Sequence, residues 1–110
     1  MITPTRLING VALTASLATY YTVPSTVLSA TAKQLVVCNT DSVSHTFTYE
    51  VIPSGGTAGV AATMFSSVTL QPHQTSIFGL TDVMAVGTFI QASADTAAVV
   101  SLTLSGMVNT

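Results

Sequence analysis

The chain has 110 residues, of which two are Lys or Arg and four are Asp or Glu, so the formal net charge is −2 and only 5% of residues are charged. This length allows one domain with one modest core, and so few cations argue against a nucleic-acid partner, whose phosphates require Lys and Arg in numbers. Thr and Ser contribute 19 and 12 residues. Because a net charge near zero favours association, we expect a homo-oligomer rather than a free monomer.

Hydropathy predicts that the chain does not enter a membrane, and its cysteine content excludes an internal disulfide. Every apolar stretch is interrupted before the ~18 residues that a spanning helix needs. Asn9-Gly10 also breaks the segment that a signal peptide would require. We therefore expect synthesis in the cytoplasm and no membrane partner. Cys38 is the only cysteine, so an internal disulfide is excluded, and its apolar neighbours predict a buried, inert thiol.

The N-terminal third begins with a segment that has no periodicity. We expect Met1–Arg6 to form an arm, separate from a domain over residues 7–110 and ordered mainly by contact with a neighbouring subunit or the capsid shell. Val11–Leu17 then alternates, with apolar residues at the odd positions, and Tyr20–Val23 reads as a short strand before a proline. Both patterns favour β-structure.

The middle of the chain carries the strongest strand patterns. Leu35–Cys38 is continuously apolar, which predicts a central strand covered on both faces. Ser44–Val51 has period two, with Phe47, Tyr49 and Val51 expected in the core and Glu50 outside. The glycine-rich loop of residues 53–59 follows it. The stretch Val60–Phe65 is ambiguous, because its apolar residues would also line one face of a helical turn.

The C-terminal half predicts four more strands. Residues 67–70 and 75–80 flank a proline turn, Gln71–Gln74. In residues 89–94 we expect Ile90, Ala92 and Ala94 to face inward, and in residues 98–105 we expect Ala98, Val100, Leu102 and Leu104 on one side. The polar link at Asp95-Thr96 is short, so these last two strands are predicted to form a hairpin. The whole pattern indicates an all-β chain, a single antiparallel β-sandwich or jelly-roll-like domain of about 7–9 short strands.

Titratable residues are few and scattered along the sequence, and their pattern does not indicate an active site. The only imidazoles are His45 and His73, and the only carboxylates are Asp41, Glu50, Asp82 and Asp95. His45 lies on the apolar face of a strand, where a structural histidine with satisfied ring nitrogens is commoner than a base. No metal-ligand spacing or phosphate-binding loop occurs. We expect no enzyme activity, no catalytic or metal residue and no cofactor.

The order of strand and turn landmarks resembles that of a known group of proteins. The landmarks are Tyr21-Thr22-Val23-Pro24, Leu35-Val36-Val37-Cys38-Asn39-Thr40, the run from Phe47 to Gly56, Val68-Thr69-Leu70-Gln71-Pro72, Ile90–Ala94 and Leu102–Gly106. From about Leu7 to Gly106 the chain resembles small all-β virion structural proteins of tailed bacteriophages. The resemblance implies a capsid decoration (cement) protein, made in the bacterial host cytoplasm and located on the virion. Such a protein would act as a homo-oligomer such as a trimer, with the major capsid protein or other virion proteins as partners.

An assembly function would need an interface, and an adhesion function would need a glycan site. Candidate interface residues are Ile2, Pro4, Leu7, Ile8, Tyr20 and Tyr21. The alternative function is a carbohydrate-binding adhesion module in a tail, neck or fibre. Such sites use exposed aromatic residues beside Asp, Asn or Gln, whereas this chain has three tyrosines and no tryptophan.

Overall fold

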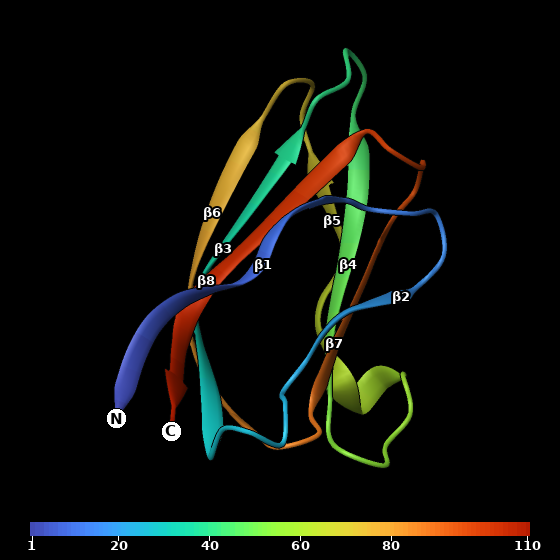
Figure 1. Cartoon of the computed structure of the whole chain (residues 1–110). Helices are drawn as coiled ribbons and strands as arrows, with labels where there is room; N and C mark the ends of the chain where they lie inside the picture. The colour runs from blue at the N-terminus through green and yellow to red at the C-terminus, as the bar shows by residue number, and fades with distance from the viewer.

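Two four-stranded antiparallel sheets pack face to face in the computed structural model, which describes residues 1–110 (Figure 1). Sheet A has the order β1-β8-β3-β6 and sheet B the order β2-β7-β4-β5. The predicted all-β sandwich is therefore confirmed. The strands are β1 (Ile2–Ala12), β2 (Ala18–Thr22), β3 (Ser29–Asn39), β4 (His45–Ile52), β5 (Thr63–Leu70), β6 (Thr75–Ala85), β7 (Phe89–Ala94) and β8 (Val100–Asn109), with one 3-10 turn, η1 (Val60–Ala62).

The strand pairing is that of an eight-stranded jelly roll. Antiparallel pairs join β1 to β8, β2 to β7, β3 to β6 and β4 to β5. The two halves of the chain thus run side by side as one long hairpin, whose turn is the β4–β5 connection, and the hairpin rolls up into two sheets. Consecutive strands change sheets at every connection except β4–β5. The hairpin expected between residues 89–94 and 98–105 is therefore wrong, because β7 belongs to sheet B and β8 to sheet A.

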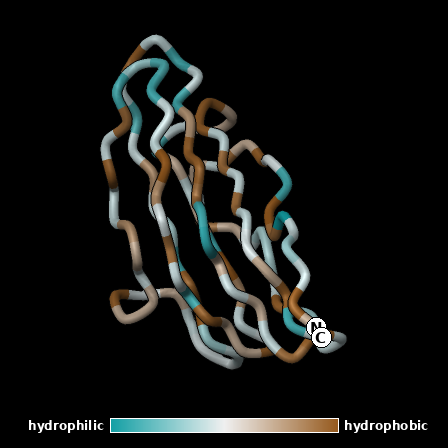
Figure 2. The backbone as a smooth tube through the Cα atoms, turned by 90° about the vertical axis from the view of Figure 1, so that its left-hand side faces the viewer, coloured by the Kyte–Doolittle hydropathy of each residue, from teal (hydrophilic) through white to brown (hydrophobic).

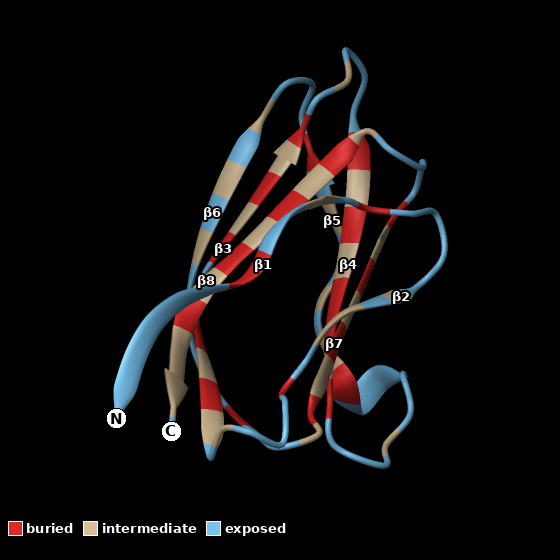
Figure 3. Ribbon diagram, viewed as in Figure 1, coloured by how far each residue is buried: buried red, intermediate tan, exposed pale blue.

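The core lies between the sheets and follows the predicted alternation. In β7, Ile90, Ala92 and Ala94 are buried, and in β8 every second residue from Val100 to Leu104 is buried. Figure 3 shows buried and partly buried positions alternating along β8. The same alternation appears along the backbone in Figure 2 as changes of hydropathy. Ala98 is a correction, since it lies exposed in the β7–β8 turn with φ 66°.

The inward-facing side chains of β4 are those that were predicted, and side chains on its outer face are buried as well. Phe47 and Tyr49 are buried in the core, and Val51 packs against it half-buried. Glu50 points to the other side of sheet B, as expected, but it is buried rather than solvated. The β4–β5 connection covers this outer side, because Ile52 and Ala62 of η1 are buried outside the main core and the backbone N–H of Gly59 donates to Glu50 Oε1 at 3.0 Å.

The N-terminal segment is not an arm detached from the domain. Residues 2–6 belong to β1 and pair with β8 from Ile2–Asn109 to Arg6–Ser105, so the expected boundary at residue 6 falls inside a strand of the sandwich. These five residues are nevertheless exposed, as Figure 3 shows. Because β1 ends at Ala12, the strand expected over residues 11–17 is also wrong, although Leu13 is buried.

Strand β3 takes the predicted central place in sheet A, between β8 and β6. Its inner residues Leu35 and Val37 are fully buried, whereas Val36 and Cys38 on the outer side are only partly covered. The expectation of a strand covered on both faces, with a buried thiol at Cys38, is corrected accordingly. No helix in the structure has the length and hydropathy to cross a membrane.

Candidate functional site

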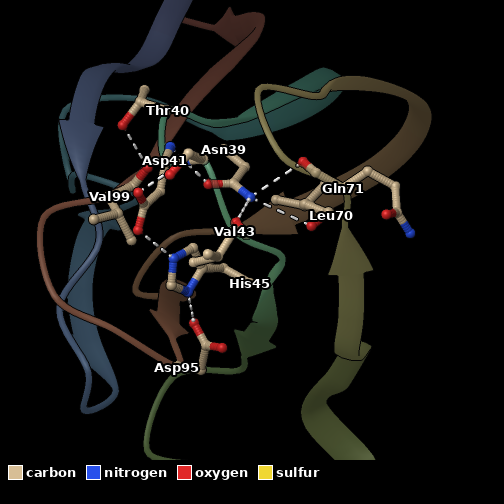
Figure 4. Close-up of polar contacts among 10 residues, drawn as sticks. Asn39, Thr40, Asp41, Val43, His45, Leu70, Gln71, Asp95 and Val99 are labelled. Carbon is tan, nitrogen blue, oxygen red and sulfur yellow. Dashed lines mark hydrogen bonds and ion pairs between the residues drawn. The ribbon is translucent and has the colours of Figure 1, made fainter.

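Polar side chains gather at the end of the sandwich that carries the β1–β2, β3–β4, β5–β6 and β7–β8 connections, which we call the loop end (Figure 4). Asn39, the fully buried last residue of β3, organises it. Its side-chain amide donates to the backbone oxygens of Val43 at 2.9 Å, Leu70 at 3.3 Å and Gln71 at 3.1 Å. Its Oδ1 accepts the backbone N–H of Asp41 at 3.0 Å. One amide therefore ties the β3–β4 loop to the β5–β6 turn.

His45 joins the same loop to the β7–β8 turn. Its Nε2 lies 2.8 Å from Asp41 Oδ2 and its Nδ1 lies 2.8 Å from Asp95 Oδ1, on opposite sides of a buried ring (Figure 4). The Asp41 hydrogen bond is the main cause that raises the pKa of His45, burial opposes it, and Asp95 adds to it. The His45 hydrogen bond in turn lowers the pKa of Asp41. The two carboxylates thus favour an imidazolium that donates both ring protons.

This arrangement holds loops together and is not poised for acid–base chemistry. A catalytic histidine presents one ring nitrogen to a nucleophile and is oriented through the other. Both nitrogens of His45 are occupied by carboxylates, so the predicted structural histidine is confirmed. The two carboxylates also lie on opposite sides of the ring, and no cluster of three or more His, Cys, Asp or Glu residues is placed to hold a metal ion. No pocket opens on the surface.

A second polar pair lies between the sheets and consists of Tyr49 of β4 and Asp82 of the edge strand β6. Tyr49 Oη and Asp82 Oδ2 are buried, and neither has a hydrogen-bond partner within the chain. Burial raises the pKa of Asp82, and burial together with the Asp82 charge raises the pKa of Tyr49. Tyr49 belongs to a cluster of four rings: Phe65 and Phe78 have centroids 4.7 Å apart, and Phe47 and Tyr49 each lie 5.9 Å from Phe65.

The predicted interface residues fall into three environments. Ile2 and Pro4 are exposed on β1 and remain available. The prediction of Leu7 and Ile8 as interface residues is wrong, because a bulge between Arg6 and Ile8 turns both side chains into the core. Tyr20 and Tyr21 are half-buried against the core in β2. The Tyr20 hydroxyl accepts the backbone N–H of Thr14 at 3.2 Å, so it serves the fold rather than an open glycan site.

Exposed apolar side chains are the more prominent surface feature, and Ile2 is the only one of them among the predicted interface residues. Ten large hydrophobic side chains are 40% to 95% exposed. Two of them, Ile77 and Val83, lie on the outer side of the edge strand β6, at 62% and 69% exposure. The alternation of Thr75–Leu80 could have indicated Ile77, which is one of its odd positions, but the sequence does not show that β6 is an edge strand. That position depends on the long-range pairing.

Charges are few around these side chains. Both cations, Arg6 and Lys33, are exposed in sheet A, on β1 and β3, and neither forms an ion pair. The carboxylates lie elsewhere: Asp41 and Asp95 with His45, Glu50 under the β4–β5 connection, and Asp82 between the sheets. The outer side of β6 therefore carries no charged residue.

Comparisons with known proteins bear on the fold. No family model matches the chain, and no curated protein sequence matches it. Among solved structures, a chain in the structure of infectious bursal disease virus, Gx strain, is similar with a TM-score of 0.56 and 10% sequence identity. The match covers 96% of this chain but only 32% of the viral chain. At this identity the likeness concerns the fold, which is the antiparallel sandwich described above.

Proposed function

We propose that this chain is a non-enzymatic virion structural protein that acts by self-association and by contact with neighbouring shell proteins, as a bacteriophage capsid decoration (cement) protein does. One observation carries the assembly role: ten large hydrophobic side chains stand exposed on a surface that has almost no charge. Exposed apolar side chains are available for burial against another protein surface, which is the main driving force of protein association. Burying it between copies removes it from water without stranding ions.

The placement on a virus particle is supported by the fold. Eight-stranded jelly rolls are a common architecture of viral capsid domains, though lectins and cupins share it. The similar chain in the infectious bursal disease virus structure extends this support to a virus. The landmarks shared with small phage virion proteins favour a bacteriophage, and they make the major capsid protein the partner that we propose.

The structure gives the rival functions less support. The buried histidine has both ring nitrogens engaged by carboxylates, and no pocket opens beside it. For carbohydrate adhesion, the tyrosines that could stack on a sugar are half-buried or buried. A structural role therefore remains the function that this geometry supports best.

Immunogold electron microscopy tests the proposal. Antibodies raised against the recombinant chain are applied to density-purified particles of the virus that encodes it, with particles from a deletion mutant as the control. We expect labelling spread over the capsid surface of the normal particles alone. Labelling confined to the tail or fibre would overturn the decoration role in favour of adhesion. Recovery of the protein only in the soluble fraction would overturn the virion role altogether.

A further inference from the structure

Each sheet of the sandwich leaves two edge strands, β1 and β6 in sheet A and β2 and β5 in sheet B. An edge strand presents unpaired backbone N–H and C=O groups, which form a template for pairing with another chain. Proteins shield such edges with proline, charge, bulges or short strands. Comparing the four edges shows which one is left open.

Three of the four edges carry such devices. Strand β1 contains Pro4 and Arg6 and has two register shifts. Strand β2 has only five residues and is itself shifted in register. Strand β5 has two register shifts, and Ser67 in it adopts φ 46°. Each of these features interrupts the regular ladder that a further strand would need.

Strand β6 is open over its first half. Thr75–Gly79 pairs with β3 in unbroken register, from Cys38–Thr75 to Gln34–Gly79, and contains neither proline nor charge. Outside the β3–β6 ladder, only Ala85 at its far end has a further backbone hydrogen bond. Ile77 stands 62% exposed at the centre of this segment, and a Cβ added at Gly79 would meet nothing within 4 Å. Backbone and side chains are thus both accessible.

We propose that Thr75–Gly79 pairs antiparallel with the same segment of a second copy, about a two-fold axis through Ile77, so that two sheets A become one eight-stranded sheet. The inference deepens the proposed function and rests on the self-association contained in it. Around this axis Ile77 faces the second copy's Ile77, and Thr75 faces the second copy's Gly79. An apolar pair at the centre with a small residue at each end is self-complementary, as a two-fold interface must be.

Charge favours a second copy as the occupant. The nearest outward charge is Lys33, one strand away on β3 and beyond the regular segment. In the dimer the two Lys33 residues are separated by three strand spacings, or roughly 14 Å. That exceeds the Debye length of about 8 Å at physiological ionic strength, so their repulsion is largely screened. Identical copies can therefore meet at this edge without opposing charges.

The same strand explains why the pairing stops at Gly79. The ladder with β3 shifts register between Gly79 and Asp82, which re-aims the second half of β6. Extending the pairing would enclose Asp82 further, although its Oδ2 already lacks a partner. Val83, at 69% exposure, lies beyond this point. It therefore provides a matched control on the same strand, with the same orientation and similar exposure.

Disulfide trapping tests the register. In a Cys38→Ala background, which removes the native thiol, Ile77→Cys and Val83→Cys are compared under mild oxidation. Directly opposed residues have Cβ atoms about 4.5–5.5 Å apart, close enough for a disulfide after small adjustment. We expect Ile77→Cys to form a covalent dimer and Val83→Cys to stay monomeric on non-reducing gels. Failure of Ile77→Cys to cross-link, or equal cross-linking of both variants, overturns the inference. Matching circular dichroism melts confirm that both variants are folded.

Sedimentation equilibrium gives a second readout. Ile77→Lys places two like charges opposite each other on the axis, so we expect it to raise the dimer dissociation constant by about tenfold or more, while Val83→Lys changes it little. Equal effects of the two substitutions would contradict the inference. The two proposals fail separately. If the protein is found on virions but its Ile77→Cys variant does not cross-link, the proposed function stands and the edge pairing fails. If the variant cross-links but the protein is absent from particles, the edge pairing stands and the proposed function fails.

Discussion

The surroundings of His45 and of Asp82 act on the charged forms of these two side chains in opposite ways. His45 has a carboxylate at each ring nitrogen, so its charged form is stabilised. Asp82 has an oxygen with no partner beside an equally unpartnered phenol, so its charged form is penalised. A buried polar group without a hydrogen bond lowers stability, whereas a paired one does not. The two residues therefore predict opposite dependences of stability on pH.

The His45 cluster should stabilise the fold most in mildly acidic solution. A raised pKa means that the stabilisation is complete below the ordinary value of 6.5 and is lost as pH rises through the folded-state value. The lowered pKa of Asp41 adds stability that is lost as pH falls below 3.8 towards its folded-state value. We expect His45→Gln to destabilise the protein more at pH 5 than at pH 9, measured by urea unfolding. A difference that is independent of pH would contradict this.

Replacing Asp82 should stabilise the protein at neutral pH. Because burial raises the pKa of Asp82, the folded state loses stability as pH rises from 3.8 through the folded-state value. Asp82→Asn removes that titration, so its thermal midpoint should exceed that of the parent at pH 7 and approach it near pH 4. Tyr49→Phe is the control, since it keeps Asp82 and with it the pH slope of the parent. A parent and an Asp82→Asn variant with parallel pH profiles would refute the prediction.

At this scale the sequence predicts environments better than partners. The apolar face of residues 44–51 was enough to predict a satisfied structural role for His45. Its partner Asp41 lies four residues away, but Asp95 is fifty residues distant and reaches the ring only because β4 and β7 pair. The bonds from Asn39 to Leu70 and Gln71 likewise depend on the roll of the chain. Contacts of this kind are set by topology, which local patterns do not encode.

At the scale of strands, the alternation of apolar and polar residues predicts which face of a strand points inward. It says little about which strands pair with each other. The inward residues of β7, β8 and most of β4 were predicted because period two follows from the pleat. The β7–β8 hairpin was wrong because a short polar link also suits a crossover between two closely packed sheets. The first five residues of β1 show no alternation for a related reason: they pair with β8 while both of their faces remain exposed.

Close approach of β8 to β3 gives a sharp prediction at this scale. A Cβ on Gly106, in β8, would overlap the carbonyl oxygen of Thr31 in β3. Because backbone cannot move aside as a side chain can, Gly106→Ala should destabilise the fold by about 3 kcal/mol or more. The matched strand glycine is Gly79, where a Cβ meets nothing within 4 Å, and Gly79→Ala should be neutral or stabilising by about 0.5 kcal/mol. Chemical denaturation measures both, and equal losses would show that the β3–β8 spacing is wrong.

For the whole molecule, the composition and the fold lead to the same kind of surface. A chain with 5% charged residues cannot surround its apolar surface with ions. The jelly roll engages three of the four carboxylates inside the chain, at the loop end and beneath the β4–β5 connection. What remains outside is mainly hydroxyl and aliphatic, with Ile2, Ile77 and Val83 among its most exposed apolar side chains. Such a surface favours assembly driven by burial of apolar area rather than by charge.

The last prediction follows from that surface and concerns the response of self-association to salt. Contacts between charges weaken as ionic strength rises, because the screening length falls from about 10 Å at 0.1 M to about 3 Å at 1 M. Apolar contacts do not weaken, and sulfate strengthens them because it is excluded from protein surfaces. The outer side of β6 carries no charge, and both cations lie elsewhere in sheet A.

Raising sodium chloride from 0.1 M to 1 M should therefore change the dimer dissociation constant by less than about threefold. Sodium sulfate should lower that constant. Analytical ultracentrifugation in both salts measures the two responses. Dissociation by sodium chloride would show that Arg6, Lys33 or the carboxylates hold the copies together, and the burial of β6 would then not be the driving force.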